Sequence, residues 1–374
     1  MLTIGQLAER SGETRFAVTA VQGLGAASLM RSELDDADTF GLRLIGYADD
    51  LPGNQTVAAG QNLRGYMRWV AGDLAGARAC YHAADSAFDQ AALHDSSLVL
   101  PVNFLCTVRC GRAGIARQAG EETTAAALEQ EALDEAERLG RHPNTAWVRY
   151  HLCLGAMVGG DTARAGALVE ALLALIHRHN VVYWRWHAET LAGWAEAKAG
   201  NVDSGLRRLR AGLELRHGVR AALWVPVYLA GQAEVLLDVG NAADSLAVLD
   251  ECARAISQLK QGYADPEASR LRALALQATG ASDAAIEQAF DRAHSSAARG
   301  GMRLYGLRTA ADRARRWAAI GRADDARHLL QTTLSAWPDE TATLDLRAAR
   351  AVLASLTRRS AGAFVPREPA EGWG

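Results

Sequence analysis

The chain contains 374 residues, of which 49% are hydrophobic and 22% charged, and its formal net charge is −3. This balance excludes the basic surface typical of nucleic-acid-binding proteins and the polybasic patches that bind anionic lipids. The five cysteines are an odd number without disulfide-like spacing, which is typical of a reducing compartment. Because the sequence also lacks a signal-peptide pattern and an apolar run long enough to cross a bilayer, it predicts a cytoplasmic protein without membrane contact.

At the N-terminal end, residues 3–12 (TIGQLAERSG) resemble the second helix of a repeat whose first helix is missing. The next turn is predicted at Arg31–Ser32, and Gly72 follows Ser32 by 40 residues. Between residues 90 and 101 the register breaks at an Asp-Ser-Ser segment followed by a proline. This break predicts either a longer loop on the rim of the fold or a bend that reshapes its groove.

From residue 120 onwards, glycines divide the chain into units of nearly constant length. The steps between these glycines are 40 residues, with one step of 41. The series consists of Gly120, Gly160, Gly200, Gly240, Gly280 and Gly321. A period of this size indicates a solenoid, in which each unit buries its apolar face by stacking on its neighbours.

The unit at residues 183–216 shows the pattern of one repeat most clearly. Apolar and small residues at helical spacing predict a first helix that ends at the Gly200–Asn201 turn. A second helix begins near Asp203, with leucines at three- and four-residue spacing. Each unit is therefore predicted to be a helix, a tight turn and an antiparallel helix.

Small residues twelve positions apart, Gly65 with Ala77 and Gly193 with Gly205, predict close contacts between paired helices. This spacing is typical of tetratricopeptide (TPR) repeats, whose period is about 34 residues. HEAT and armadillo repeats have periods of about 40–47 residues, which fits the length better. The glycine turn followed by a small and then a larger residue favours TPR-like units with longer helices or longer links.

These patterns predict an all-α fold, a TPR-like right-handed superhelical solenoid of about eight helical hairpins. A C-terminal capping helix is expected after Pro338. The solenoid is assigned to residues 1–357, with a weak register break near 90–101, and residues 358–374 are expected to form a flexible tail.

Candidate catalytic and metal-binding residues are sparse. His177 and His179 lie two positions apart, so a helix would point their imidazoles in nearly opposite directions. Cys106 and Cys110 lie one helical turn apart but lack a second ligand pair at recognisable spacing. Neither a nucleophile–base pair nor a phosphate-binding glycine loop is recognisable. The sequence therefore predicts a protein that is not an enzyme and holds neither a cofactor nor a metal.

Aromatic residues concentrate on the predicted first helices of three consecutive units. First helices line the concave face of a TPR superhelix, and aromatic and arginine side chains are typical of binding hot spots. The alternative is that the aromatic side chains wedge between helices as core. The predicted partner-binding set in the concave groove is Trp147, Tyr150, Trp186, His187, Trp194, Tyr228, Glu234, Glu267, Arg270 and Arg308.

Three stretches of the repeat resemble the helical repeats of bacterial signalling proteins. They are YWRWHAETLAGWAEAKAGNVDSGLRRLRAGL from residue 183, LWVPVYLAGQAEVLLDVGNAADSLAVLDE from residue 223, and LRTAADRARRWAAIGRADDARHLL from residue 307. The chain looks like the C-terminal TPR region of class III adenylate cyclase and STAND ATPase signalling and transcription-regulatory proteins. The resemblance extends from about residue 19 to residue 356.

The resemblance implies a regulatory role within such a protein, although the chain holds the repeat part alone. We therefore expect a scaffold that binds a protein or peptide partner, or a second copy of itself, through its concave groove. The alternative is a small-molecule-sensing regulatory domain, whose ligand would lie in the aromatic section at residues 147–228.

Overall fold

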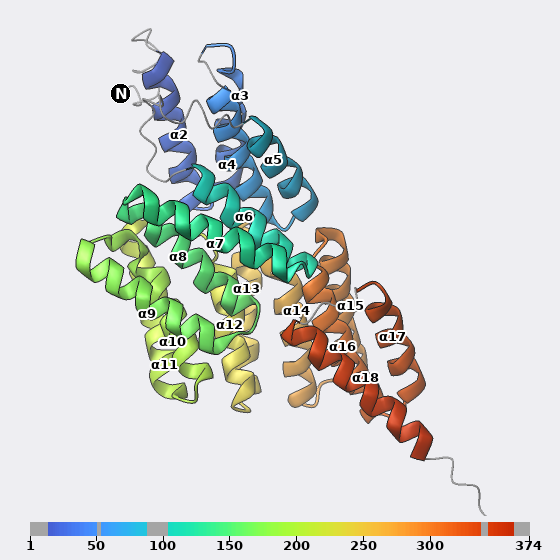
Figure 1. Ribbon diagram of the computed structural model, residues 1–374. Coiled ribbons are helices and arrows are strands. Elements are labelled where there is room, and N and C mark those ends of the chain that lie inside the picture. Colours follow the sequence, from blue (N-terminus) through green and yellow to red (C-terminus); the bar gives the residue numbers. More distant parts are fainter. Residues whose placement is uncertain (1–13, 51–53, 88–103, 338–342, 363–374) are drawn as a thin grey trace, which may run out of the picture.

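The computed structural model describes residues 14–50, 54–87, 104–337 and 343–362. Within these ranges, α-helices and short 3₁₀ helices account for all regular structure, and strands are absent. Successive helices form antiparallel hairpins that stack side by side (Figure 1). None of the helices in the described ranges combines the length and hydropathy that a bilayer crossing requires.

Within the described ranges, the helices form eight hairpins, each with a first and a second helix. The pairs are α2 (Thr14–Met30) with α3 (Leu34–Gly46), α4 (Gln55–Ala71) with α5 (Leu74–Ala87), α6 (Phe104–Ala119) with α7 (Glu122–Leu139), α8 (His142–Val158) with α9 (Thr162–His179), α10 (Arg185–Lys198) with α11 (Val202–Leu215), α12 (Val225–Asp238) with α13 (Ala242–Leu259), α14 (Asp265–Ala278) with α15 (Asp283–Gly300), and α16 (Arg303–Ala319) with α17 (Ala323–Ser335). A final helix, α18 (Leu344–Gly362), packs on α16 and α17. The predicted TPR-like all-α solenoid with a capping helix is confirmed.

Some predicted boundaries differ from the structure or lie outside it. The capping helix continues to Gly362, beyond residue 358 where the tail is expected to begin, and the division of the chain into solenoid and tail stays a prediction. The N-terminal segment 3–12 and the predicted register break at 90–101 both lie outside the described residues. The turn at Arg31–Ser32 is confirmed, because Ser32 has a left-handed φ of 61° between α2 and α3.

The periodic glycines lie between the two helices of their hairpins. From Gly72 to Gly321, each of them has a left-handed φ between 72° and 107°. Glycine reaches this region without a Cβ clash, so it ends the first helix and lets the chain reverse. The glycine period therefore marks hairpin turns, as the sequence predicts.

The residues that exceed a standard TPR period lie in the second helices and in the links between hairpins. Helices α7, α9, α13 and α15 each contain 18 residues. Short 3₁₀ helices, η3 (Val182–Trp184), η4 (Arg216–Val219) and η5 (Gly262–Ala264), lie between successive hairpins. Both predicted explanations of the longer repeat, longer helices and longer links, are confirmed.

Gly193 and Gly205 bring α10 and α11 into close contact. A Cβ at Gly193 would lie 2.2 Å from the backbone nitrogen of Leu209 and 2.6 Å from the carbonyl oxygen of Gly205. A Cβ at Gly205 would lie 2.4 Å from the backbone nitrogen of Ala197. These neighbours are backbone atoms, which cannot move aside without separating the helices.

We expect Gly193→Ala to lower the free energy of unfolding by about 1–3 kcal/mol, because the added methyl group forces α10 away from α11. Gly166→Ala is the matched control. It changes a helical glycine in α9 whose Cβ would have no heavy atom within 4 Å, and we expect it to raise stability by about 0.5–1 kcal/mol. Urea denaturation of both variants measures the difference, and equal effects would contradict the packing argument.

The first helices form the inner layer of the superhelix and are buried on more than one face. In α8, 13 of 17 residues are buried, whereas its partner α9 buries 4 of 18. A helix that is apolar nearly all round must have protein on both sides. The inner layer therefore packs against the second helices on one side and against other repeats on the other side.

The superhelix folds back so that its first hairpin meets the sixth. The backbone N–H of Ala222 donates to the carbonyl oxygen of Met30 at 2.9 Å. The Ser32 hydroxyl donates to the carbonyl oxygen of Leu259 at 2.9 Å, and the Gln261 amide donates to the Ser32 hydroxyl at 2.8 Å. These contacts join segments more than 180 residues apart in the chain.

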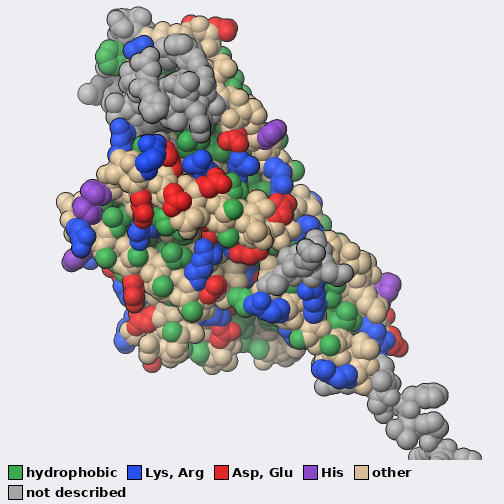
Figure 2. All heavy atoms as spheres, viewed as in Figure 1, with side chains coloured by type: hydrophobic (Ala, Val, Ile, Leu, Met, Phe, Trp, Pro, Cys, Tyr) green, Lys and Arg blue, Asp and Glu red, His purple; other side chains and the backbone are tan. Residues whose placement is uncertain are grey.

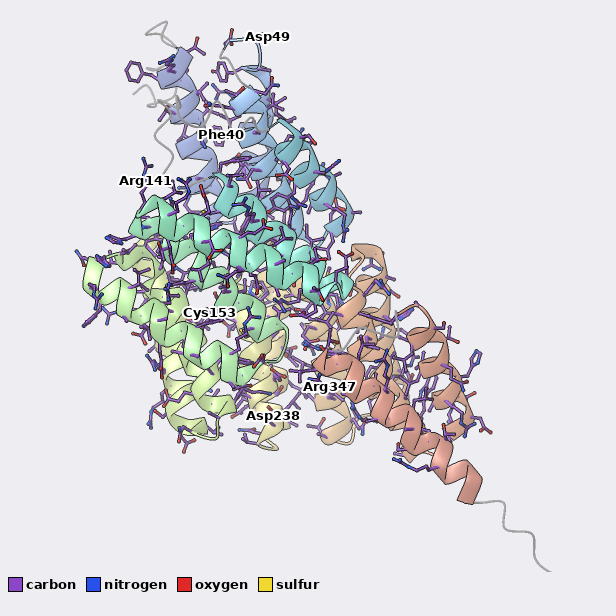
Figure 3. The ribbon with its side chains drawn as sticks, viewed as in Figure 1. Phe40, Asp49, Arg141, Cys153, Asp238 and Arg347 are labelled. Carbon is purple, nitrogen blue, oxygen red and sulfur yellow. The ribbon has the colours of Figure 1, made fainter. Side chains whose placement is uncertain are left out.

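The surface carries both signs of charge. On the face shown in Figure 2, acidic and basic side chains are interspersed over most of the helices. Figure 3 shows Cys153 among the helices, while Asp49 and Arg141 lie at the periphery. All five cysteines are buried and stand outside disulfide bonds, and burial raises the pKa of the Cys106 thiol to about 12. They serve as small apolar side chains, as the sequence indicates.

Candidate functional site

The interior of the superhelix contains a hydrogen-bonded column of aromatic side chains from distant repeats. The Trp224 indole N–H donates to the Tyr66 oxygen at 2.8 Å, across 158 positions of sequence. The Tyr66 hydroxyl lies 2.8 Å from Nε2 of His151, whose Nδ1 lies 2.9 Å from the carbonyl oxygen of Trp147. A neutral His151 with its proton on Nδ1 satisfies every group, because each donor then has one acceptor.

Burial keeps the histidine side chains of this column uncharged at neutral pH. Burial lowers the pKa of His151 to about 3, so the imidazole can accept the Tyr66 hydroxyl proton at neutral pH. His187, whose Nδ1 lies 2.7 Å from the Tyr228 hydroxyl, has its pKa lowered well below the usual value for the same reason. Both imidazoles are buried, so these contacts hold the interior together.

The aromatic members of the predicted binding set belong to this interior. Their exposed fractions are 3% or less: Trp147 3%, Tyr150 0%, Trp186 1%, His187 0%, Trp194 1% and Tyr228 0%. Apart from Trp147, which borders a hollow described below, these side chains have no surface that a partner could touch. The structure therefore places five of them in the core, and their predicted contact with a partner stays a prediction.

The sequence held a signal for this outcome. In residues 147–157, aromatic, aliphatic and small side chains occur on all sides of the predicted helix rather than along one stripe. A helix with this pattern is buried on more than one face. Hot-spot composition alone does not distinguish a buried aromatic side chain from an exposed one.

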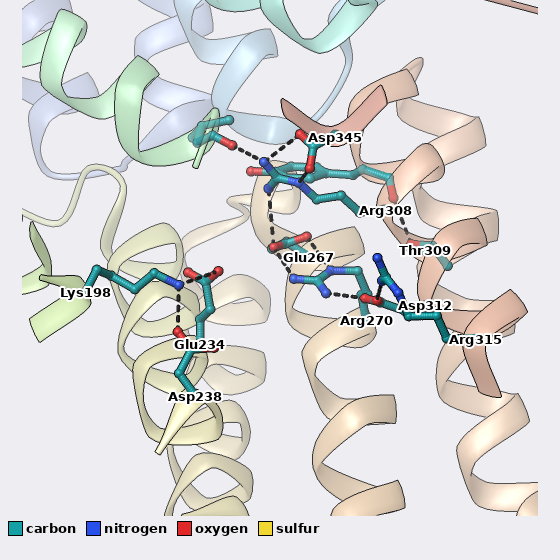
Figure 4. Close-up of polar contacts among 12 residues, drawn as sticks. Lys198, Glu234, Asp238, Glu267, Arg270, Arg308, Thr309, Asp312, Arg315 and Asp345 are labelled. Carbon is teal, nitrogen blue, oxygen red and sulfur yellow. Dashed lines mark hydrogen bonds and ion pairs between the residues drawn. The ribbon is translucent and has the colours of Figure 1, made fainter. Parts of the chain in front are cut away.

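The four charged members of the predicted set lie on the inner layer of the C-terminal half. Arg270 donates two hydrogen bonds to Glu267, at 2.7 Å and 3.0 Å, and also pairs with Asp312. Arg308 donates two hydrogen bonds to Asp345, at 2.8 Å and 3.0 Å (Figure 4). These ion pairs link α14, α16 and α18.

Arg308 also reaches the other half of the molecule. Its Nη2 donates to the carbonyl oxygen of Val158, at the end of α8, at 2.6 Å. Its Nη1 lies 3.5 Å from Glu267. Burial alone would raise the pKa of Glu267, but Arg270 and Arg308 outweigh this effect and lower the pKa to about 2. Glu267 is therefore ionised wherever the protein is folded near neutral pH.

Glu234 continues this row of charges towards α10. Lys198 of α10 lies 3.3 Å from Glu234 and 2.6 Å from Asp238, both on α12. We name the complete set the charged ladder, because α10, α12, α14 and α16 each contribute to it. Its members are Lys198, Glu234, Asp238, Glu267, Arg270, Arg308, Asp312 and Arg315.

Exposure varies along the charged ladder. Its centre is nearly closed to solvent, with 10% of the Arg270 side chain and 14% of the Arg308 side chain exposed. Its ends are open: 31% of Glu234, 53% of Asp238 and 49% of Arg315 are exposed. The ladder can therefore exchange hydrogen bonds with another molecule at its ends while its centre holds the fold.

The inner layer of the N-terminal half is lined by apolar side chains instead of paired charges. An apolar hollow of about 570 Å³ lies between α2, α4, α6, α8 and the segment 181–184. We name it the N-terminal hollow. Its lining includes Leu29, Leu63, Tyr66, Phe104, Trp147 and Trp184. In the described part of the chain, groups of three or more histidine, cysteine or carboxylate side chains placed to hold a metal ion are absent.

Comparison with known proteins finds similarity to solved structures but not to sequence families. No protein-family profile and no curated protein matches the chain. Among solved structures, it is similar to a Rap protein complexed with competence and sporulation factor, at 13% identity and a TM-score of 0.59. The alignment covers 93% of this chain and 99% of the Rap chain. This likeness shows a shared arrangement of helical repeats along nearly the whole of both chains.

Weaker likenesses extend to two other helical-repeat structures. Yeast Tom70 aligns at 14% identity with a TM-score of 0.40, over 89% of this chain and 62% of that chain. The TPR domain of P58(IPK) aligns at 13% identity with a TM-score of 0.28, over 96% of this chain and 97% of that chain.

Proposed function

We propose that this chain is a non-catalytic interaction module that docks a protein or peptide partner along the charged ladder. One observation carries the proposal: successive first helices of the C-terminal half place paired charges in one row on the inner layer, with open ends. Such a row can recognise a partner whose charges alternate in the complementary order.

The physical form of the site supports docking rather than chemistry. Each cation of the ladder already has a carboxylate partner, so its charges are held in place before a partner arrives. A preformed surface avoids the entropy cost of ordering side chains on binding. The Rap protein similar to this chain was crystallised with competence and sporulation factor, which supports a binding role for a superhelix of this kind.

The proposal includes the kind of protein in which this module acts. The resemblance to bacterial signalling ATPases and cyclases suggests a regulatory role in the cytoplasm. There the partner would be another domain of such a protein, a separate protein, or a second copy of this chain. In each case the ladder supplies charge recognition and the helical array supplies a rigid support.

The test inverts charge at the open ends of the ladder. The double variant Glu234→Lys and Arg315→Glu changes two side chains that are 31% and 49% exposed, and Lys198 keeps its pair with Asp238. Glu251→Lys with Arg254→Glu is the matched control, because it makes the same exchange on exposed positions of the second helix α13. Circular dichroism checks that both variants keep their helicity.

Partners are captured from a lysate of the source cells with the unchanged chain, identified by mass spectrometry, and purified for titration. We expect the ladder variant to weaken binding by about tenfold or more and the α13 variant to change it by less than about twofold. Equal affinity of all three proteins would contradict docking on the ladder. If the purified chain bound no protein and turned over a substrate, the proposed docking function would be wrong.

A further inference from the structure

We propose that the N-terminal hollow binds an uncharged, mainly apolar small molecule, a role beyond the docking of a protein on the charged ladder. The hollow has a volume of about 570 Å³. Small-molecule sites typically measure about 300–1,000 Å³ and are lined by apolar and aromatic side chains with few polar groups. The N-terminal hollow meets each of these conditions.

Small residues on the inner layer create the space. Gly23, Ala26 and Ala27 of α2 and Ala59 of α4 line the hollow where other first helices carry large side chains. Gly23 is exposed where it borders the hollow, and a Cβ there would have no heavy atom within 4 Å. By contrast, a Cβ at Gly231 on α12 would lie 2.1 Å from Met157, because the interior there is already filled. The hollow thus lies between the small side chains of α2 and α4 and the aromatic side chains of Tyr66, Trp147 and Trp184.

The polarity of the hollow disfavours a ligand that would bury a charge. Within the described part of the chain, its lining contains neither acidic nor basic side chains. Transferring an unpaired ion from water into such surroundings costs several kcal/mol or more, in order of magnitude. A neutral molecule avoids this cost and gains by burying apolar surface against Phe104, Trp147 and Trp184.

Four side chains of the lining carry polar atoms that are buried and have no hydrogen-bond partner. These atoms are Oε1 of Gln22, Oδ1 of Asn62, Nε1 of Trp147 and the hydroxyl oxygen of Tyr183. Each buried polar group without a hydrogen-bond partner lowers the stability of the fold by roughly 1–3 kcal/mol. Tyr66, which also lines the hollow, bonds His151, so these four are the buried side-chain atoms of the lining that lack a partner.

The hydrogen-bonding capacity of these four atoms indicates which groups a ligand must carry. The Gln22 and Asn62 oxygens accept hydrogen bonds, the Trp147 indole donates one, and the Tyr183 hydroxyl can do either. A matching ligand carries an N–H or O–H group and one acceptor on an otherwise apolar skeleton. An aromatic or alicyclic amine, alcohol or amide belongs to this class.

The first test uses N-phenyl-1-naphthylamine, a neutral fluorescent probe with one N–H group. Its matched control is 1-anilinonaphthalene-8-sulfonate, which has the same aromatic skeleton with a negatively charged sulfonate. We expect one neutral probe to bind per chain with an affinity at least about tenfold higher than that of the sulfonate. Equal affinities, or a preference for the sulfonate, would overturn the proposal.

The second test fills the hollow. Gly23→Trp places a large side chain in open space on α2, whereas Gly166→Trp makes the same change in α9, where a Cβ also has no heavy atom within 4 Å. We expect the first variant to lose at least about tenfold in affinity for the neutral probe and the second to keep it. With helicity and melting temperature preserved, unchanged binding by Gly23→Trp would overturn the proposal.

A third measurement separates this site from the charged ladder. The variant Glu234→Lys with Arg315→Glu should bind the neutral probe as the unchanged chain does, so the two proposals can fail independently. Displacement of the probe by a captured protein partner would assign the hollow to the protein interface and overturn the small-molecule proposal.

Discussion

Replacing Arg308 with alanine is expected to lower the free energy of unfolding by about 3–5 kcal/mol. The Arg308 side chain is 14% exposed and donates to Asp345, to the carbonyl oxygen of Val158 and to Glu267. Its removal takes two hydrogen bonds from Asp345 and leaves Glu267 with Arg270 as its remaining cation. A buried carboxylate that loses a cation is destabilised far more than an exposed one.

Arg272→Ala is the matched control for this prediction. Arg272 pairs with Asp250 at the surface, where 31% and 57% of the two side chains are exposed. Exposed ion pairs contribute about 0–1 kcal/mol because water and salt screen them. Guanidinium denaturation of both variants gives the comparison. A loss of less than about 1 kcal/mol for Arg308→Ala would show that the ladder's centre does not hold the fold together.

Replacing Trp224 with alanine is expected to cost about 3–5 kcal/mol of unfolding free energy. Trp224 is 1% exposed, and its ring lies against Trp69 and Tyr263 with centroid distances of 4.9 Å and 5.1 Å. Its indole also supplies the hydrogen bond to Tyr66. Trp224 has a left-handed φ of 64°, which a bulky residue adopts at a cost, so the packing that it gains there must outweigh that strain.

The same substitution should loosen the contact between the N-terminal and central hairpins, since Trp224 and Tyr66 belong to different parts of the superhelix. Hydrogen exchange in α2 and α4 should therefore accelerate more than exchange in α16. Trp317→Ala is the control: this tryptophan is half-buried, bonds Glu287 at 3.1 Å and has Arg322 4.4 Å from its ring centre. A uniform increase in exchange along the chain would contradict a local role for Trp224.

Several features of the candidate sites could be predicted from neighbouring residues, and others could not. Glu267 and Arg270 lie three positions apart, so a helix brings them together on one face. Asp345 and Val158 lie 37 and 150 positions from Arg308, and only the stacking of repeats brings them to it. The N-terminal hollow combines Gln22, Asn62 and Tyr183 from separate hairpins, and their sequence contexts share no common pattern.

The sequence by itself determined the repeat unit. Glycines at hairpin turns, small residues at close helix contacts and apolar residues at helical spacing act over one or two turns of helix. These local interactions define the hairpins, their number and the capping helix. Such features are readable because each depends on residues close together in the chain.

Only the tertiary structure decided which surface of the inner layer is open. The sequence places aromatic side chains on the first helices, but whether they line a groove or fill it depends on how far the superhelix curves. That curvature accumulates from small rotations at every hairpin contact, so it brings Tyr66 to Trp224 and leaves space beside Gly23. Long-range closure therefore converted most of the predicted aromatic groove into core.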